Sequence, residues 1–202
     1  MRWIMRKEFE IAYIKAQEVL DKMHYSNKEM IRTSSVIDTV EEILNLDVKF
    51  SDYDFKKFNN KKLDFSNYGA AMAVFKNDEA TSVSILLNER ESPKMKRFSL
   101  VHELGHLMTN YEECAKDFQI STHIDMDITS IPNEVLNDNE FLIKEQVANI
   151  FALLVLIPFE MLIDATKRFG SLNEVSDFLG VENSAVISRL RLEDAQKLIN
   201  AK

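Results

Sequence analysis

In the stretch RFSLVHELGHLMT, residues 97–109, two histidines four positions apart, His102 and His106, enclose Glu103. On an α-helix, residues four apart differ by about 40° around the axis, so both imidazoles can reach one metal ion. Two imidazoles, a third protein ligand and one open position are what a hydrolytic zinc site requires. Glu103 lies on the flank of the same face, where it can accept a proton from water without binding the metal. The stretch therefore predicts the active-site helix of a zinc-dependent hydrolase, spanning residues 96–109.

Two histidines at helical spacing can also occur by coincidence, but three features of this chain argue for a metal site. The motif contains two of only four histidines. Its neighbours are apolar on nearly every side, which predicts a core helix where uncoordinated polar groups are costly. Gly105 lies in the middle of the helix at a cost of about 1 kcal/mol relative to alanine. In a chain with four glycines, this predicts that another element packs very close to Gly105.

A third ligand is expected from the stretch EQVANIFALLVLIP, residues 145–158. Glu145 begins a segment that is otherwise almost wholly apolar, and a buried carboxylate is rarely tolerated unless it is paired or binds a metal. The alternative is that Glu145 lies near a helix N-terminus and favours the helix dipole. Glu140 is the next candidate ligand, followed by His123.

Both stretches resemble the ImmA/IrrE family of metallopeptidases, the second through its E-x-x-A-N-x-F-A pattern. The resemblance covers roughly residues 48–158. It implies zinc held by His102, His106 and Glu145, with Glu103 as catalytic base. It also implies an α+β fold: a zincin-like, gluzincin-type core with flanking helices.

Members of the family that this chain resembles are regulatory proteins encoded by bacteria, phages or other mobile elements. Several of them relieve repression by cutting a helix-turn-helix repressor encoded nearby. The resemblance therefore implies a zinc-dependent metalloendopeptidase whose protein substrate is such a repressor. Manganese is the alternative metal, although two imidazoles and one carboxylate suit zinc. The rival functions are a non-cleaving regulatory or antitoxin-type binding module and a DNA-binding regulator.

Composition indicates the class of protein, its expected cellular location and the kinds of partner that are disfavoured. Its 202 residues are 46% apolar and 29% charged, which is typical of a globular protein. The single cysteine, Cys114, cannot form an internal disulfide, which favours a reducing cytoplasmic location. The longest apolar run, residues 150–157, is too short to cross a membrane. A formal net charge of −8 disfavours direct nucleic-acid binding.

Periodicity predicts a domain at residues 1–165, with a helical preamble at 1–47 and the sheet and active-site helices at 48–165, followed by a C-terminal helical segment at 166–202. Apolar positions Ile11, Ile14, Ala16, Val19, Leu20 and Met23 are expected on one face of the first helix. The expected helices are 8–23, 34–44, 96–109, 140–157, 158–168, 172–179 and 184–199, and the strands of a small antiparallel or mixed sheet are 48–55, 70–75 and 83–87. Pro158 is expected as a first helical residue, Gly170 and Gly180 as left-handed stops, and Ser171 with Glu174 as a capping box.

The stretch from 110 to 139 is acidic, with seven carboxylates against Lys116. We consider two roles for it: a rim that attracts a basic, DNA-binding substrate, or a solvated loop without a partner. Candidate donors to the oxyanion of a peptidase transition state are Tyr68, Tyr111, His123 and Asn149, and Asn149 could instead orient a metal ligand. Cys114 is interpreted as an ordinary thiol.

Residues 172–179 and 184–199, with a turn between them, have helix-turn-helix spacing. The second of these helices offers Arg189 and Arg191, but two acidic residues follow directly. Residues 171–202 contain four basic and five acidic side chains, whereas a phosphate-binding surface should be basic. A role in packing or substrate docking is therefore the favoured interpretation.

Overall fold

The computed structural model describes residues 2–25, 29–55, 69–76, 81–114 and 139–200. In this part of the chain it contains seven helices and a small three-stranded sheet, which confirms an α+β fold. The helices are α1 (Arg2–Met23), α2 (Thr33–Leu44), α3 (Pro93–Cys114), α5 (Asn139–Leu156), α6 (Phe159–Arg168), α7 (Leu172–Leu179) and α8 (Asn183–Asn200). The strands are β1 (Asp47–Tyr53), β2 (Ala70–Lys76) and β3 (Thr81–Asn88).

The sheet is mixed, and its strands lie in the order β1-β3-β2. β1 runs parallel to β3, and β2 runs antiparallel to it, with Met72 opposite Ile85. Side chains alternate between the two faces of β3: Val83, Ile85 and Leu87 join the main core, whereas Leu86 packs against a small cluster on the other face. One face of the sheet therefore packs against the helices.

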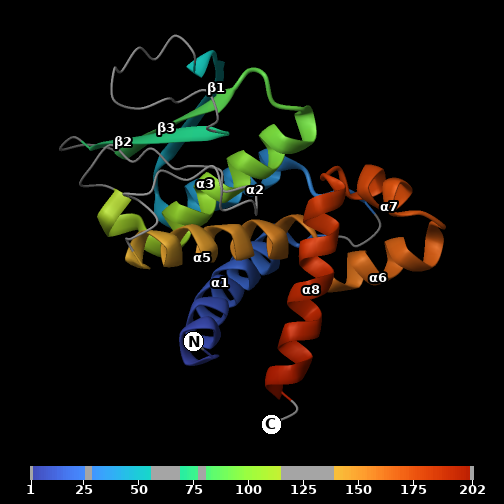
Figure 1. Ribbon diagram of the computed structural model, residues 1–202. Coiled ribbons are helices and arrows are strands. Elements are labelled where there is room, and N and C mark those ends of the chain that lie inside the picture. Colours follow the sequence, from blue (N-terminus) through green and yellow to red (C-terminus); the bar gives the residue numbers. More distant parts are fainter. Residues whose placement is uncertain (1, 26–28, 56–68, 77–80, 115–138, 201–202) are drawn as a thin grey trace.

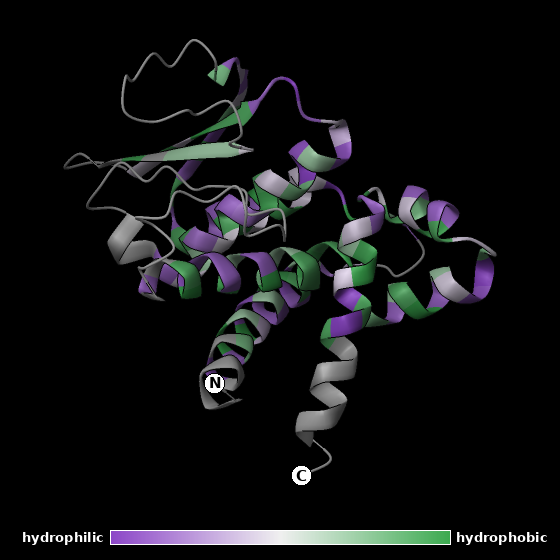
Figure 2. Cartoon of the chain, in the orientation of Figure 1, coloured by the Kyte–Doolittle hydropathy of each residue, from purple (hydrophilic) through white to green (hydrophobic). Residues whose placement is uncertain are grey.

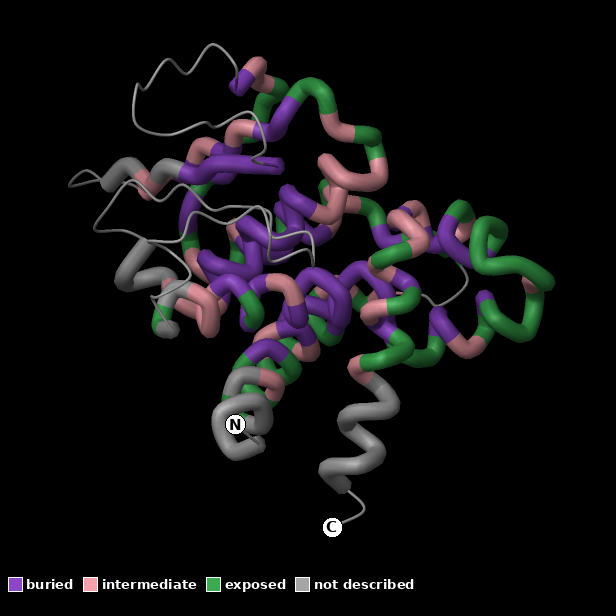
Figure 3. The backbone as a smooth tube through the Cα atoms, viewed as in Figure 1, coloured by how far each residue is buried: buried purple, intermediate pink, exposed green. Residues whose placement is uncertain are grey.

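The helices form successive layers beneath the sheet (Figure 1). α3 lies against β2 and β3, α5 packs along α3, and α1 packs on the opposite side of α5. α5 is apolar around most of its circumference (Figure 2), as expected of a helix enclosed on several sides. Its residues from Ala148 onwards are almost all buried (Figure 3). α3 and α5, the two helices that contain the predicted site residues, are therefore packed against other elements on several sides.

α1 differs from expectation in the face that it buries. Ile11 and Ile14 are 38% and 56% exposed, so their predicted place in the apolar face is wrong. The buried stripe contains Ala12, Ala16 and Val19, together with Leu20. α1 packs on α5, and small alanine side chains let two helices approach closely. The burial of Ala16, Val19 and Leu20 confirms that part of the predicted face, whereas Ala12 was not predicted.

α3 begins three residues earlier than predicted, at Pro93. The Ser92 hydroxyl oxygen accepts a hydrogen bond from the Met95 backbone N–H at 3.1 Å, so Ser92 caps the helix and Pro93 takes its first position. The helix also continues past Thr109 to Cys114, with a break at Asn110 (φ −139°, ψ 32°).

Of the four helix starts and ends predicted in the C-terminal part, the structure confirms two. Ser171 caps α7 by accepting from Glu174 N–H, and Gly180 ends that helix with φ 64°. Pro158 precedes α6 as its capping residue rather than entering the helix. Gly170 is not left-handed, because the chain leaves α6 at Phe169 in an extended conformation (φ −114°, ψ 144°).

Buried side chains on both sides of the predicted boundary at residue 165 belong to one core cluster, for example Leu156 and Leu179. The division into residues 1–165 and 166–202 stays a prediction. Among the described helices, no single one has the length and apolarity to cross a membrane. α5 and α6 meet those criteria only as a pair that is bent by 56°.

Candidate metal centre

α3 brings His102 and His106 together as the four-residue spacing predicts. Their Nε2 atoms lie 3.1 Å apart, and the rings meet edge to face with centroids 4.7 Å apart. Both imidazoles are buried, as is Glu103 beside them. Two nitrogen atoms therefore face one point inside the protein rather than solvent.

Glu145 of α5 contacts both of these imidazole nitrogens. Its Oε1 lies 3.0 Å from His106 Nε2, and its Oε2 lies 3.3 Å from His102 Nε2. The carboxylate is only 2% exposed. The Oε2 contact with His102 does not have the geometry of a good hydrogen bond, and a buried charged oxygen in this arrangement is costly unless a cation binds there.

Gly105 lets the two ligand-bearing helices meet. A Cβ atom at this position would lie 3.0 Å from Phe151 Cδ1 and 3.1–3.2 Å from the backbone of Ala148. Ala148 follows Glu145 by about one helical turn. The close approach predicted at Gly105 is therefore present, and the element that approaches is the helix that carries Glu145.

Asn149 lies behind His102, on the side away from the shared point. Its Oδ1 is 2.9 Å from His102 Nδ1. An amide oxygen only accepts hydrogen bonds, so Nδ1 of His102 must carry the proton and donate. In the neutral ring, Nε2 then has a free lone pair directed at His106 and Glu145, which is the tautomer a metal ligand needs.

The charges of the cluster support one another. Burial alone would raise the pKa of Glu145, but contacts with His102 and His106 outweigh it and lower that pKa to about 2. Burial alone would lower the pKa of His102, but the hydrogen bond and charge of Glu145 outweigh it and raise that pKa. Glu145 is therefore an anion at neutral pH.

These residues could hold one metal ion. The candidate ligand atoms of His102, His106 and Glu145 all lie within 4.8 Å of one another. Ligands at about 2.0–2.1 Å from a tetrahedral ion are separated by about 3.3 Å from each other, and the contacts here measure 3.0–3.3 Å. The donor set and its spacing both fit such an ion.

A family model described as the IrrE N-terminal-like domain, Peptidase_M78, matches residues 43–191. The chain belongs to this peptidase family. No curated protein gives a significant match. The family match contains His102, Glu103, His106 and Glu145, and it extends beyond the predicted span of 48–158 to include α6, α7 and half of α8.

Other residues that the sequence offered for the peptidase site lie elsewhere. Glu140 is 74% exposed and pairs with Lys144 at 3.1 Å, so it does not join the cluster. Tyr68, His123 and the acidic residues 115–138 lie outside the described residues. Tyr111 and Cys114 lie in the last turns of α3, where the structure describes the backbone but not these two side chains. Asn149 is thus the one oxyanion candidate with a described side chain, and it contacts His102 instead.

The two arginines of the helix-turn-helix-like segment have different environments. Arg189 is 2% exposed, and its Nε donates to the Ile157 carbonyl oxygen at 2.9 Å. Arg191 is exposed. Since Arg189 is buried against the end of α5, it is not available to a phosphate group, in line with the predicted packing role.

Proposed function

We propose that this protein is a zinc-dependent metalloendopeptidase in which His102, His106 and Glu145 bind the metal. The observation that carries the proposal is the convergence of two imidazole nitrogens and one carboxylate at 3.0–3.3 Å in a buried site. Membership of the peptidase family supports the same reaction class. Two imidazoles and one carboxylate favour zinc over manganese.

Glu103 is proposed as the catalytic base. A zinc ion held by the three ligands would supply Lewis-acid chemistry, which activates water at neutral pH and polarises a peptide carbonyl. The Glu103 carboxylate takes one proton from the attacking water as the C–O bond forms. It then delivers that proton to the amide nitrogen as the C–N bond breaks. Asn149 keeps the Nδ1 proton of His102 in place throughout.

We propose a basic, DNA-binding protein as the substrate, specifically a helix-turn-helix repressor encoded by the same locus or mobile element. Support comes from the family resemblance and from the acidic stretch 110–139, which carries seven carboxylates and one lysine. Opposite charges would speed association and make it salt-dependent. Raising ionic strength should therefore slow cleavage of such a repressor markedly, and an unchanged rate would remove the charge-steering part of the proposal.

The metal site is tested by measuring metal content in three purified proteins: wild type, Glu103→Gln and Glu145→Ala. Near-stoichiometric zinc is expected in the wild type and in Glu103→Gln, and much less in Glu145→Ala. This pattern separates the base from the ligand. No metal in any folded variant after reconstitution would overturn the peptidase proposal.

The second candidate function is a non-cleaving protein-binding module. A site that only bound a metal would not need Glu103 beside its ligands, and this residue favours hydrolysis. The two functions are separated by incubating a bound repressor with the wild type and with Glu103→Gln. Cleavage by the wild type alone supports a peptidase, whereas equal binding without cleavage by either supports the module.

A further inference from the structure

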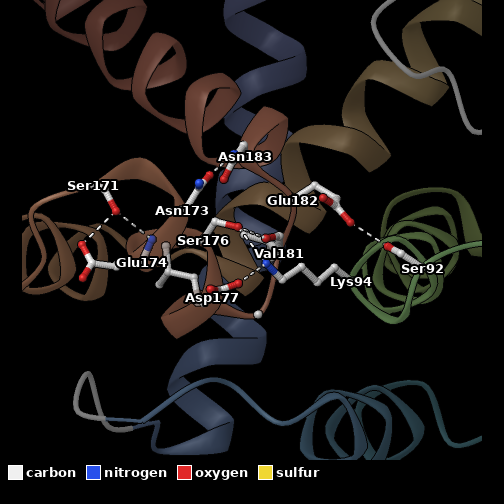
Figure 4. Close-up of polar contacts among 12 residues, drawn as sticks. Ser92, Lys94, Ser171, Asn173, Glu174, Ser176, Asp177, Val181, Glu182 and Asn183 are labelled. Atoms are coloured by element: carbon white, nitrogen blue, oxygen red, sulfur yellow. Dashed lines mark hydrogen bonds and ion pairs between the residues drawn. The ribbon is translucent and has the colours of Figure 1, made fainter.

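Polar contacts join the N-terminal end of α3 to the α7–α8 unit, which consists of α7, the turn at residues 180–182 and α8 (Figure 4). The Ser92 hydroxyl donates to Glu182 Oε1 at 2.6 Å. Lys94 Nζ donates to Ser176 Oγ at 2.9 Å and to Asp177 Oδ1 at 2.6 Å. These contacts join segments more than 80 positions apart in the sequence, so they report tertiary packing.

Arg97 makes the deeper connection, one turn further along α3. Its Nη1 donates to the carbonyl oxygens of Leu179 at 2.5 Å and Gly180 at 2.8 Å, and its Nη2 donates to that of Ile31. The Leu179 and Gly180 carbonyls belong to the end of α7, where helical partners run out. A guanidinium at a helix C-terminus also suits the helix dipole. Burial lowers the pKa of Arg97 to about 10, so the group is still charged at neutral pH.

The backbone at Gly180 is shaped for this guanidinium. Gly180 has φ +64°, and a Cβ atom there would lie 2.5 Å from Arg97 Nη1 and 2.2 Å from Met30 Sδ. Both the left-handed conformation and the lack of space exclude a larger residue. The turn therefore closes directly over the arginine of α3.

Arg189 connects the same unit to the other ligand-bearing helix. It lies on α8, and its Nε donates to the carbonyl oxygen of Ile157, the residue that follows α5. The α7–α8 unit thus receives an arginine from α3 and gives one to the end of α5. In both cases the guanidinium satisfies a carbonyl at a helix C-terminus.

We propose that the α7–α8 unit is a brace for the metal site, and that Arg97 and Arg189 are positioning residues that hold α3 and α5 in register. The proposal rests on the proposed function, because it assigns the brace to the ligands His102, His106 and Glu145. Two ligands lie on one helix and one on the other, so a slide of about 1 Å between the helices would spoil a site whose contacts measure 3.0–3.3 Å. Helices behave as stiff rods, and fixing their ends limits such a slide.

The test compares Arg97→Met and Arg189→Met with two matched controls. Lys96→Met removes the neighbouring cation of α3, which pairs with Asp52 near solvent. Arg191→Met removes the exposed arginine of α8. A fifth variant, Val48→Ala, destabilises the buried side of β1 without touching the brace. Zinc affinity is measured by competition with a chromophoric chelator, and the visible spectrum of the Co²⁺-loaded protein reports ligand geometry.

We expect both brace variants to lose about tenfold in zinc affinity and to change the Co²⁺ spectrum. Lys96→Met and Arg191→Met should match the wild type, and Val48→Ala should unfold more easily while keeping the wild-type spectrum. The brace is overturned if Arg97→Met and Arg189→Met keep wild-type affinity and spectrum, or change them no more than Val48→Ala does. If Arg97→Met does not fold, Arg97→Lys replaces it, and the same two readouts apply. Lysine keeps the charge but lacks the forked guanidinium, whose two nitrogens contact the Leu179 and Gly180 carbonyls and the Ile31 carbonyl separately.

Amide hydrogen exchange of the metal-free proteins separates failure of the brace from failure of the proposed function. Faster exchange at 98–106 and 145–149 in both brace variants, beyond that in Val48→Ala, supports the brace without reference to metal. Exchange equal to that of Val48→Ala overturns it. A wild type that binds neither zinc nor Co²⁺ overturns the metal-site proposal, and with it the assignment of the brace to that site.

Discussion

Asn149 Oδ1 lies 2.9 Å from Nδ1 of His102, and Asn149 follows Glu145 by four positions on the same helix. α5 therefore presents, one turn apart, both a candidate ligand and the group that orients a ligand of α3. The geometry of the candidate metal centre depends on the register between two helices as much as on the local histidine motif.

Replacing Asn149 by alanine should weaken zinc binding by about 10–100-fold, because His102 loses the acceptor that holds its Nδ1 proton. Asn149→Asp retains an acceptor and should bind far better than the alanine variant. Gln146→Ala, at an exposed position of the same helix, serves as the control. Equal affinities in Asn149→Ala and Gln146→Ala, measured by chelator competition, would contradict the orienting role.

Gly105→Ala should destabilise the protein by about 1–3 kcal/mol, although helix propensity alone favours alanine by about 1 kcal/mol. The added methyl would meet Phe151 and Ala148 at 3.0–3.2 Å and push α5 away from α3. Gly170→Ala is the matched comparison, since the nearest atom there is 4.0 Å away, and it should be neutral or slightly stabilising. Urea denaturation of both variants measures the difference, and similar stabilities would show that the helix contact is not tight.

The free energy of unfolding should depend on pH in the alkaline range because of Tyr25. Burial and the charge and hydrogen bond of Glu160 raise its pKa from 10.0 to about 12, and its hydroxyl donates to Glu160 Oε2 at 3.2 Å. The folded chain thus holds this proton more tightly than the unfolded chain, so the stabilisation is complete below pH 10 and is lost as the pH rises through 12. Denaturation between pH 9 and 12 should show a steeper decline in the wild type than in Tyr25→Phe.

Glu160→Gln provides a second check on Tyr25. Ultraviolet titration should show the phenol ionising at lower pH than in the wild type, yet still above 10, because burial is the largest cause of the shift. A titration curve identical to that of the wild type would rule out the contribution of Glu160.

Glu103→Gln should lower kcat for a cleavable repressor by about 10²–10⁴-fold, since the amide cannot accept the proton of the attacking water. Its zinc content should equal that of the wild type, because Glu103 is not among the candidate ligands. Single-turnover cleavage with zinc-loaded proteins measures the rate. Full activity in this variant would require another base.

Features that depend on neighbours a few positions apart could be predicted from the residues alone. The four-residue spacing of His102 and His106 is a helical period, and the capping of α7 by Ser171 and its end at Gly180 follow from local backbone chemistry. The start of α3 was also readable, because Ser92 before Pro93 is a capping signal, although the apolar pattern pointed three residues further on. The same locality explains why the α+β class and the order of the elements could be predicted.

The contacts between elements depend on how the helices pack, which local sequence patterns do not specify. Glu140 and Glu145 lie on the same helix, about 140° apart around its axis. The packing of α5 on α3 buries Glu145 and leaves Glu140 in solvent. The face of α1 that is buried, with Ala12 rather than Ile14, was likewise set by its neighbour α5. The sequence gives no sign that Arg97 and Arg189 are buried partners of backbone carbonyls. Their partners lie at the ends of α7 and α5, which are distant in the sequence. Sequence spacing determines the angles between residues of one helix. The register between helices depends on contacts between elements, such as the packing of Gly105 on Ala148 and, in our proposal, the arginine contacts of the α7–α8 unit.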